Sequence, residues 1–162
     1  MLASSARVFA GFVVGAGVGS QLTNVSTEGF FGSSPKKIII ATPNAPNAIG
    51  PYSQAVKAGD TLYVSGCIGL NPTDQKLVSG GIRSETEQAL QNMSAILKEG
   101  GSDCSMVVKT TVLLNDMADY GAVNEVYKKY FNEGKPARAA FAVRELPGKA
   151  SVEIDAVAIC KK

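Results

Sequence analysis

The chain has 162 residues, enough for one domain with a buried core plus a tail, and its 45% hydrophobic and 19% charged residues are typical of a globular protein. The formal net charge of +2 provides no strong field for attracting a polyanion, so nucleic-acid binding is not expected. Histidine is absent, which excludes Ser-His-Asp and Cys-His catalysis and removes the commonest metal ligand.

Residue spacing disfavours two further kinds of site. The three cysteines, Cys67, Cys104 and Cys160, are an odd number without metal-ligand spacing, so we interpret them as reduced and mostly structural thiols. No Walker-type phosphate-binding motif is present, and the glycine-rich run at 11–19 does not lie between a strand and a helix. Neither a zinc site nor a nucleotide site is therefore expected.

Residues 1–35 differ in composition from the rest of the chain. Arg7 is their only basic residue and Glu28 their only acidic one, and the apolar run at 8–19 is too short for an ordinary membrane span. The segment resembles a secretory signal or a weak mitochondrial presequence, and its early serines favour the presequence. We expect a targeting or disordered extension before a domain at 36–162, with a mitochondrial location favoured over the cytoplasm or another organelle.

Strands are predicted in the first part of this domain. The expected strands are residues 37–41, 53–58 and 61–65. Gly59 and Asp60 form the turn of a hairpin between the second and third strands. Tyr52 then lies where the chain enters the sheet, and Ser65 and Gly66 lie where it leaves.

Two amphipathic segments predict helices. Residues 84–87 (SETE) resemble a capping box before the first helix, and Gly100 and Gly101 follow that helix as a C-cap. Asp116 is expected to cap the second helix, which ends before Gly134. The expected buried stripes are Ala89, Leu90, Met93, Ile96 and Leu97 in the first helix, and Tyr120, Val123, Tyr127, Tyr130 and Phe131 in the second.

Strands at 107–114, around Arg138 and at 152–159 complete the order β-β-β-α-β-α-β-β. This order predicts an α+β fold of two layers, with both helices on one face of the sheet. The other face also carries many apolar residues, and self-association is the simplest way to cover it.

Arg138 is the first candidate site residue. Strand alternation places it on one face with Ala140 and Ala142, whose small side chains leave room for a ligand. A guanidinium carries a permanent charge and a planar fork of donors, which suits a carboxylate. The alternative is an ordinary surface arginine or half of an ion pair.

Glu153 is the second candidate. It shares a face of the last strand with Asp155, and an acid in such a position needs a partner or a function. Glu153 is suited to activate a water as a general base, or alternatively to pair with a cation such as Arg138. A hairpin turn near Pro147 would place Glu153 opposite Ala142, leaving Arg138 ~13 Å away along the strand. A ligand or a second subunit between the two charges is therefore expected.

The other polar residues give weaker signals. No cationic neighbour is expected to lower the pKa of Cys67 or Cys104, so neither is favoured as a nucleophile. The hydroxyls of Tyr52 and Ser65 lie at junctions of loop and strand, where they are suited to orient a polar substrate or to serve the fold.

Six ordered motifs resemble those of the reactive intermediate deaminase (Rid, YjgF-like) family. They are IGPYSQ at 49–54, LYVSG at 62–66, QALQNM at 88–93, VKTTV at 108–112, PARAA at 136–140 and VEIDAVA at 152–158. The resemblance implies a chorismate-mutase-like fold and a homotrimer whose sheets surround a central barrel, with active sites between subunits. It also implies hydrolysis of 2-imino acids, the enamine/imine products of pyridoxal-phosphate dehydratases, to 2-oxo acids and ammonia without a cofactor.

By the same resemblance, Arg138 binds the substrate carboxylate, Glu153 holds and activates water, and Tyr52 and Ser65 orient the imine. Main-chain contacts to the substrate are expected from Gly66, Cys67 and Ala140. Many members have glutamine where Cys67 stands, and many bacterial members have cysteine where Ala140 stands. Cys67 is therefore a candidate for sensitivity to thiol reagents.

Other functions are compatible with the same sequence. One is a non-catalytic regulator that binds a small carboxylate through Arg138. The family resemblance adds a translation inhibitor or single-strand ribonuclease, and a chaperone-like protein. The net charge of +2 and the lack of a basic, aromatic strip disfavour RNA cleavage. The preferred imino acid does not follow from the sequence.

Overall fold

A computed structural model describes residues 36–161, so the expected targeting segment lies outside the described residues. The strands are β1 (Lys37–Ile40), β2 (Ala55–Ala58), β3 (Thr61–Ile68), β4 (Val107–Leu114), β5 (Ala137–Ala142) and β6 (Val152–Ile159), and the helices are α1 (Ile82–Glu99) and α2 (Tyr120–Tyr130). Their succession confirms the predicted order of strands and helices. Within these residues, no helix is long and apolar enough to cross a membrane.

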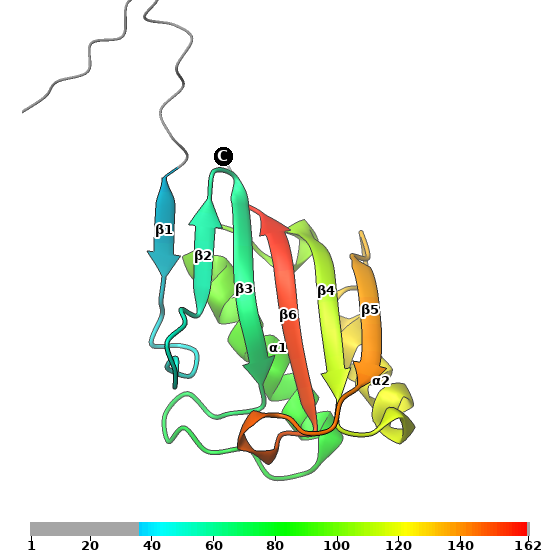
Figure 1. The fold of residues 1–162 in the computed structure, drawn as a ribbon. Coiled ribbons are helices and arrows are strands. Elements are labelled where there is room, and N and C mark those ends of the chain that lie inside the picture. The colour runs from blue at the N-terminus through cyan, green and yellow to red at the C-terminus, as the bar shows by residue number, and fades with distance from the viewer. Residues whose placement is uncertain (1–35, 162) are drawn as a thin grey trace, which may run out of the picture. The chain divides into compact units, whose positions relative to one another are not determined.

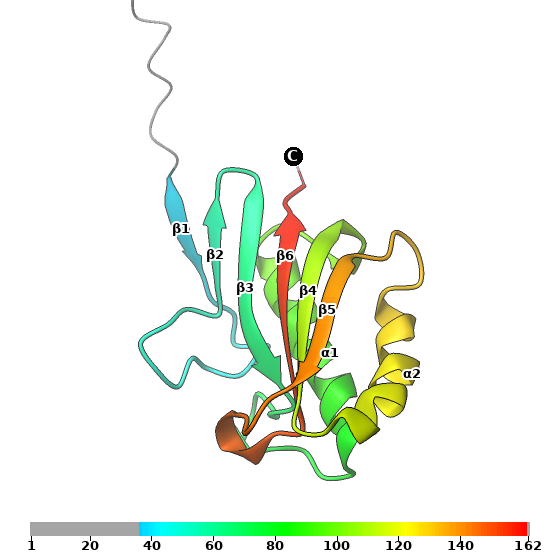
Figure 2. The same cartoon turned by 45° about the vertical axis from the view of Figure 1, so that its right-hand side comes forward.

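One mixed sheet contains all six strands in the order β1-β2-β3-β6-β4-β5. Neighbouring strands are antiparallel except for β4 and β5, which run parallel and are connected through α2. Both helices lie on the same face, with α1 behind β3 and β6 and α2 toward the β5 edge (Figures 1 and 2). The predicted two-layer α+β arrangement is therefore confirmed.

The predicted pairing of β5 with β6 is wrong. β4 lies between them, and β6 pairs with β3 on its other side. The burial of β6 explains its central place, because Val152, Ile154, Ala156 and Ala158 are at most 2% exposed. β5 contributes small, partly exposed residues, which are better suited to an edge.

The start of α1 also differs from the prediction. The helix begins at Ile82 after Gly81, and no side chain caps it. Ser84 therefore already lies inside the helix, and the proposed capping box is wrong. Glu85 is buried and accepts hydrogen bonds from the backbone N–H and hydroxyl of Ser151, at 2.7 and 2.9 Å. Glu87 instead accepts a hydrogen bond of 2.6 Å from the hydroxyl of Tyr130 on α2.

The predicted ending of α1 is confirmed, and the predictions for the second helix are confirmed in part. After α1, the N–H of Ser102 donates to the carbonyl of Leu97 at 2.8 Å and Gly101 has φ 80°, which is a Schellman ending. Asp116 accepts from the N–H of Ala118 at 2.9 Å and caps a short 3-10 turn that continues into α2. The predicted stripe of α1 is buried. In α2, Val123, Tyr127 and Phe131 are buried as predicted, but Tyr120 and Tyr130 are only partly buried, and Val126 is buried without having been predicted.

Candidate active site

A pocket of about 420 Å³ lies where β3 and β6 meet the loop before β2. The predicted site residues that line it are Tyr52, Ser65, Gly66, Cys67 and Glu153. Arg138 and Ala140 are not among its lining residues. The structure thus brings together most of the predicted site but separates it from the predicted carboxylate-binding arginine.

A β-bulge shapes the wall of this pocket. Val64 pairs with Ala156 and Cys67 pairs with Ile154, so Ser65 and Gly66 together lie opposite a single residue of β6. The strand therefore continues to Ile68, and the prediction that it ends at Ser65 is wrong. A bulge increases the local twist and changes the direction of nearby groups, which is why bulges often border binding sites. The Ser65 hydroxyl donates to the carbonyl of Ser53 at 2.7 Å and fixes the bulge to the preceding loop.

Position 66 must be a glycine, because the Glu153 carboxylate occupies the space that a side chain would need. A Cβ atom placed on Gly66 would lie 1.8 Å from Oε1 of Glu153 and 2.6 Å from its carboxyl carbon. That distance is far inside any van der Waals contact, so any other residue would displace the carboxylate. The bulge and the missing side chain together create the space that Glu153 occupies.

Glu153 is half-buried, and within residues 36–161 no side chain or backbone group donates a hydrogen bond to its carboxylate. Burial raises the pKa of Glu153, and the nearby charge of Asp155 raises it further. Asp155 is itself held in place, because its Oδ1 accepts from the N–H of Thr111 at 2.8 Å. Glu153 therefore combines an accessible carboxylate that lines the pocket with a raised pKa, which are the properties of a general base in a cleft.

The cysteines are unsuited to nucleophilic chemistry. Cys67 is 6% exposed, and burial followed by the charges of Glu153 and Asp155 raises its pKa to about 12. Cys104 is partly buried, which raises its pKa, and its sulfur lies 3.3 Å from the Ser94 hydroxyl. Since the thiolate is the reactive form, these environments disfavour the hypothesis that Cys67 makes the site thiol-sensitive.

Tyr52 lies on the loop that precedes β2 and is 50% exposed. Its hydroxyl accepts a hydrogen bond of 3.3 Å from the N–H of Ile49, and its ring lies close to Gly50. The phenol thus borders the pocket and keeps the O–H available as a donor toward a bound molecule.

Arg138 lies on the opposite face of the sheet. It pairs in register with Thr110, whose buried hydroxyl lies 2.7 Å from that of Tyr127 on α2, so both point toward the helices. The Arg138 guanidinium donates to the Tyr120 hydroxyl at 3.0 Å and lies 4.7 Å from the centre of the Tyr127 ring. These contacts hold the cation in a defined orientation at the edge of the sheet.

Glu153 pairs in register with Leu113 and lies on the helix-free face, with β4 between β6 and β5. The separation of Glu153 from Arg138 therefore arises from opposite faces, and not from the hairpin spacing that the sequence suggested. Among residues 36–161, Arg138 forms no salt bridge with any carboxylate. Ala140 pairs with Val112 and packs against the core on the side of Arg138.

Two buried amides that support the pocket were missed by the sequence analysis. Gln54 accepts from the N–H of Thr42 at 2.7 Å and donates to three carbonyls of the loop, including that of Pro46 at 2.7 Å. Asn92 donates to the carbonyls of Ile68 and Leu70 at 3.0 and 2.9 Å. The sequence did contain a signal for each amide. Gln54 directly precedes the apolar strand β2, and Asn92 lies among the buried apolar residues of α1, so each is a polar residue in a position where burial is expected.

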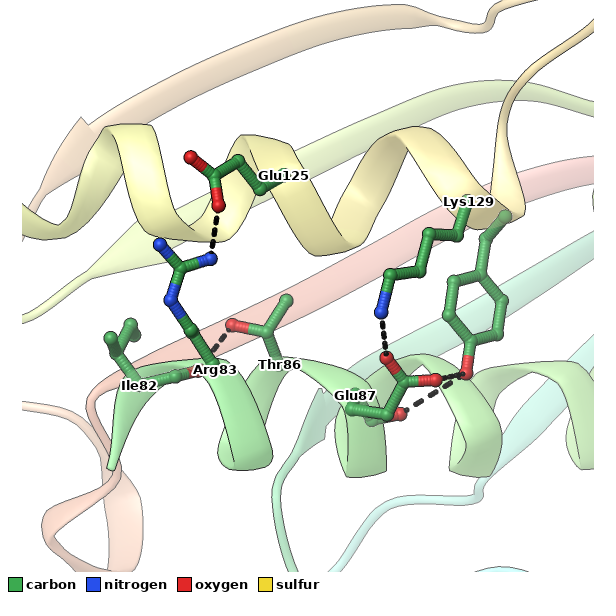
Figure 3. Close-up of polar contacts among 7 residues, drawn as sticks. Ile82, Arg83, Thr86, Glu87, Glu125 and Lys129 are labelled. Carbon is green, nitrogen blue, oxygen red and sulfur yellow. Dashed lines mark hydrogen bonds and ion pairs between the residues drawn. The ribbon is translucent and has the colours of Figure 1, made fainter. Parts of the chain in front are cut away.

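A second, wider hollow of about 690 Å³ lies between α1 and α2 and contains none of the predicted site residues. Its charged groups are largely paired across the helices (Figure 3): Arg83 binds Glu125, and Lys129 lies 3.3 Å from Glu87. Because these partners lie within the chain, the hollow offers fewer free groups to a ligand than the smaller pocket.

Comparison with known proteins identifies the family. The family model described as Endoribonuclease L-PSP matches residues 42–160. The chain belongs to this family. A human 2-iminobutanoate/2-iminopropanoate deaminase is 54% identical over 127 residues, which cover 78% of this chain and 93% of the human protein. The resemblance drawn from the sequence motifs is thereby confirmed.

Two further proteins are similar to this chain. The chloroplastic Reactive Intermediate Deaminase A of Arabidopsis thaliana is 49% identical over 126 residues, covering 78% of this chain and 67% of the plant protein. The crystal structure of E. coli TdcF with bound serine has a TM-score of 0.73 and 34% identity, covering 76% of this chain and 99% of TdcF.

Proposed function

We propose that this protein hydrolyses reactive 2-imino acids, such as 2-iminobutanoate and 2-iminopropanoate, to 2-oxo acids and ammonia. The observation that carries the proposal is the half-buried Glu153 carboxylate, which lies over Gly66 and receives no hydrogen bond from residues 36–161. Relatives that are 52–54% identical bear the name of this activity. Hydrolysis of these imines protects pyridoxal-phosphate enzymes from damage by 2-aminoacrylate.

The proposed chemistry requires little more than a placed water. A protonated imine is already electrophilic at C2, so orientation and a base supply most of the catalysis. Glu153 takes a proton from water as its oxygen bonds to C2, and a tetrahedral carbinolamine forms. Glu153 then returns the proton to the nitrogen, and the C–N bond breaks as Glu153 takes the proton of the carbinol hydroxyl. That proton passes to the departing ammonia, so ammonium and a 2-oxo acid leave and the carboxylate is restored. Tyr52 and Ser65 orient the nitrogen end, and Gly66 and Cys67 supply main-chain contacts. Ala140 supplies a main-chain contact from the copy of the chain that carries Arg138 at the site.

In this proposal Arg138 binds the substrate carboxylate from a second copy of the chain. One copy holds Arg138 and Glu153 on opposite faces of its sheet, so a site with both needs two copies. The helix-free face also exposes apolar side chains, among them Ile39, Tyr63 and Phe141 at 53%, 52% and 49%. Covering such a surface favours association. We therefore propose a homotrimer with sheets around a central barrel and active sites between subunits.

The direct test is to generate 2-iminopropanoate and 2-iminobutanoate with an amino-acid oxidase and to follow their decay. The wild-type chain is expected to accelerate decay, and Glu153→Gln and Arg138→Ala are expected to abolish the acceleration. Equal decay with and without the wild-type protein would contradict the proposal. Retained affinity for a 2-oxo acid without turnover would instead support the non-catalytic regulator.

RNA cleavage is the second function named by the family, and the pocket disfavours it. Glu153 and Asp155 place two carboxylates at its base, which would repel a phosphate backbone. The net charge of +2 offers little compensation. Ribonuclease activity that survives Glu153→Gln would point to a different site or a contaminant.

For location, we propose that residues 1–35 target the domain at 36–162 to the mitochondrion. The support is the low acidic content and the apolar run of this segment. A fusion of residues 1–35 to a fluorescent protein tests it: mitochondrial import is expected, and diffuse cytoplasmic fluorescence would contradict the proposal.

A further inference from the structure

Gln75 has an unusual backbone conformation for a residue with a side chain. Its φ is 58°, in the left-handed region that favours glycine. The turn around it is closed by backbone hydrogen bonds, from the N–H of Gln75 to the carbonyl of Asn71 at 2.9 Å and from the N–H of Asn71 to the carbonyl of Lys76 at 2.8 Å. Glycine would complete this turn without strain, so the local backbone gives no reason for glutamine.

The side chain of Gln75 supplies that reason, because it connects two loops. Its Oε1 accepts a hydrogen bond of 3.0 Å from the N–H of Asn47, and its Nε2 donates to the carbonyl of Pro72 at 2.6 Å. Asn47 lines the candidate active-site pocket, on the loop that also carries Tyr52. A strained residue that persists in a structure points to a role beyond its own turn.

The loop at 42–52 is thus held by two amides from different directions. Gln54 binds Thr42, Ala45 and Pro46 from the β2 side, and Gln75 binds the next residue, Asn47, from the loop after β3. The segment 48–52, which ends at Tyr52, follows these two anchors. The contact made by Gln75 is therefore the last side-chain anchor on the N-terminal side of that segment.

We propose that Gln75 is a positioning residue for the active site: its strained turn and its amide fix the loop at Asn47 and so determine where Tyr52 lies. This inference rests on the proposed imine hydrolysis for its kinetic consequence only. The structural consequence, an ordered segment at 46–52, holds whatever the pocket binds.

Gln75→Gly and Gln75→Ala in the full chain test the proposal as a pair. Both remove the amide, but only glycine also removes the strain, so the glycine variant is expected to unfold at a higher temperature than the alanine variant. Both are expected to increase amide hydrogen exchange at 46–52 to the same extent. Both are also expected to lower kcat/KM for 2-iminopropanoate by about threefold to tenfold.

Thr73→Ala is the matched control, because Thr73 lies in the same exposed turn and its side chain makes no hydrogen bond within residues 36–161. Wild-type exchange and wild-type kcat/KM are expected for it. Gln75→Gly with wild-type exchange at 46–52 would overturn the proposal. The proposal would also be overturned if the loss of activity tracked the loss of thermal stability, so that Gln75→Ala lost clearly more activity than Gln75→Gly. If the wild-type chain hydrolyses no imine, the proposed function fails, while hydrogen exchange still decides on Gln75.

Discussion

On the helix-covered face of the sheet, Arg138 contacts Tyr120 and Tyr127 of its own chain, whereas on the open face Glu153 forms no hydrogen bond or salt bridge with residues 36–161. The Arg138 guanidinium donates a hydrogen bond of 3.0 Å to the Tyr120 hydroxyl, and its central carbon lies 4.7 Å from the centre of the Tyr127 ring. Glu153 lies over a glycine beside a second carboxylate, and its pKa is raised. The fold therefore orients the cation through side chains of α2, whereas the anion borders the pocket without a hydrogen bond from residues 36–161.

Glu153→Gln is the substitution with the largest expected effect, and it tests whether the carboxylate on the helix-free face acts as a base. An amide cannot accept a proton from water, so kcat/KM for 2-iminopropanoate is expected to fall by about 10²- to 10⁴-fold. The same change removes a half-buried charge next to Asp155, so the free energy of unfolding is expected to rise at neutral pH. Imine decay and thermal unfolding measure the two effects. Lower stability with retained activity would show that Glu153 serves the fold.

Gly66→Ala tests the space above the bulge. The added methyl group collides with the Glu153 carboxylate, so activity is expected to fall by about tenfold to a hundredfold. The free energy of unfolding is expected to fall by about 1–3 kcal/mol. Gly121→Ala is the control, because its added methyl group meets no atom within 4 Å, and a small gain in stability is expected. Equal effects of the two substitutions would contradict the assigned contact.

The dependence of kcat/KM on pH tests whether the pKa of Glu153 is raised. Glu153 acts as a base only when ionised, so kcat/KM is expected to fall as the pH drops through its raised pKa. Because the pKa is higher in the folded than in the unfolded chain, Glu153 favours folding below the unfolded pKa, and this contribution is lost as the pH rises through the folded pKa.

Asp155→Asn removes the neighbouring charge while an amide oxygen still faces the N–H of Thr111. The acid limb of kcat/KM is expected to move to lower pH, because Asp155 is the second cause of the raised pKa of Glu153. An unchanged limb would mean that burial alone sets this pKa.

The smallest effect is expected on the helix-covered face. Tyr120→Phe keeps the ring but removes the hydrogen bond to Arg138, so KM is expected to rise by about threefold with little change in kcat. Tyr130→Phe is the control, because the Tyr130 hydroxyl donates to Glu87 and not to Arg138. A larger effect of the control would argue against a specific role of Tyr120.

The parts of this structure that follow from neighbouring residues were predictable. Helical stripes, the glycine ending of α1 and the alternation that places Glu153 beside Asp155 are all local patterns. The capping box failed because Glu85 and Glu87 have partners elsewhere, in Ser151 and Tyr130. A local pattern does not reveal a competing partner that is distant in the sequence.

Strand pairing and loop anchors are long-range properties, and they were not predictable. Adjacent strands with a short connection favour a hairpin, yet β6 lies between β3 and β4, where its apolar face is buried. The anchors on the pocket loop come from Gln54 and Gln75, and Gln75 lies 28 residues from its partner Asn47. The register places Arg138 and Glu153 on opposite faces, because Glu153 and Phe141 both pair with Leu113, whereas Arg138 pairs with Thr110.

The most direct test of the central claim is to combine two inactive variants, Arg138→Ala and Glu153→Gln, by unfolding and refolding them together. If equal amounts of the two variants assemble at random into trimers with one site between each pair of subunits, about a quarter of all sites would contain both intact residues. Imine hydrolysis is therefore expected to recover to about a quarter of the wild-type rate, and refolding each variant alone is expected to restore none. Mixed trimers verified by mass spectrometry that remain inactive would contradict a site built from two chains.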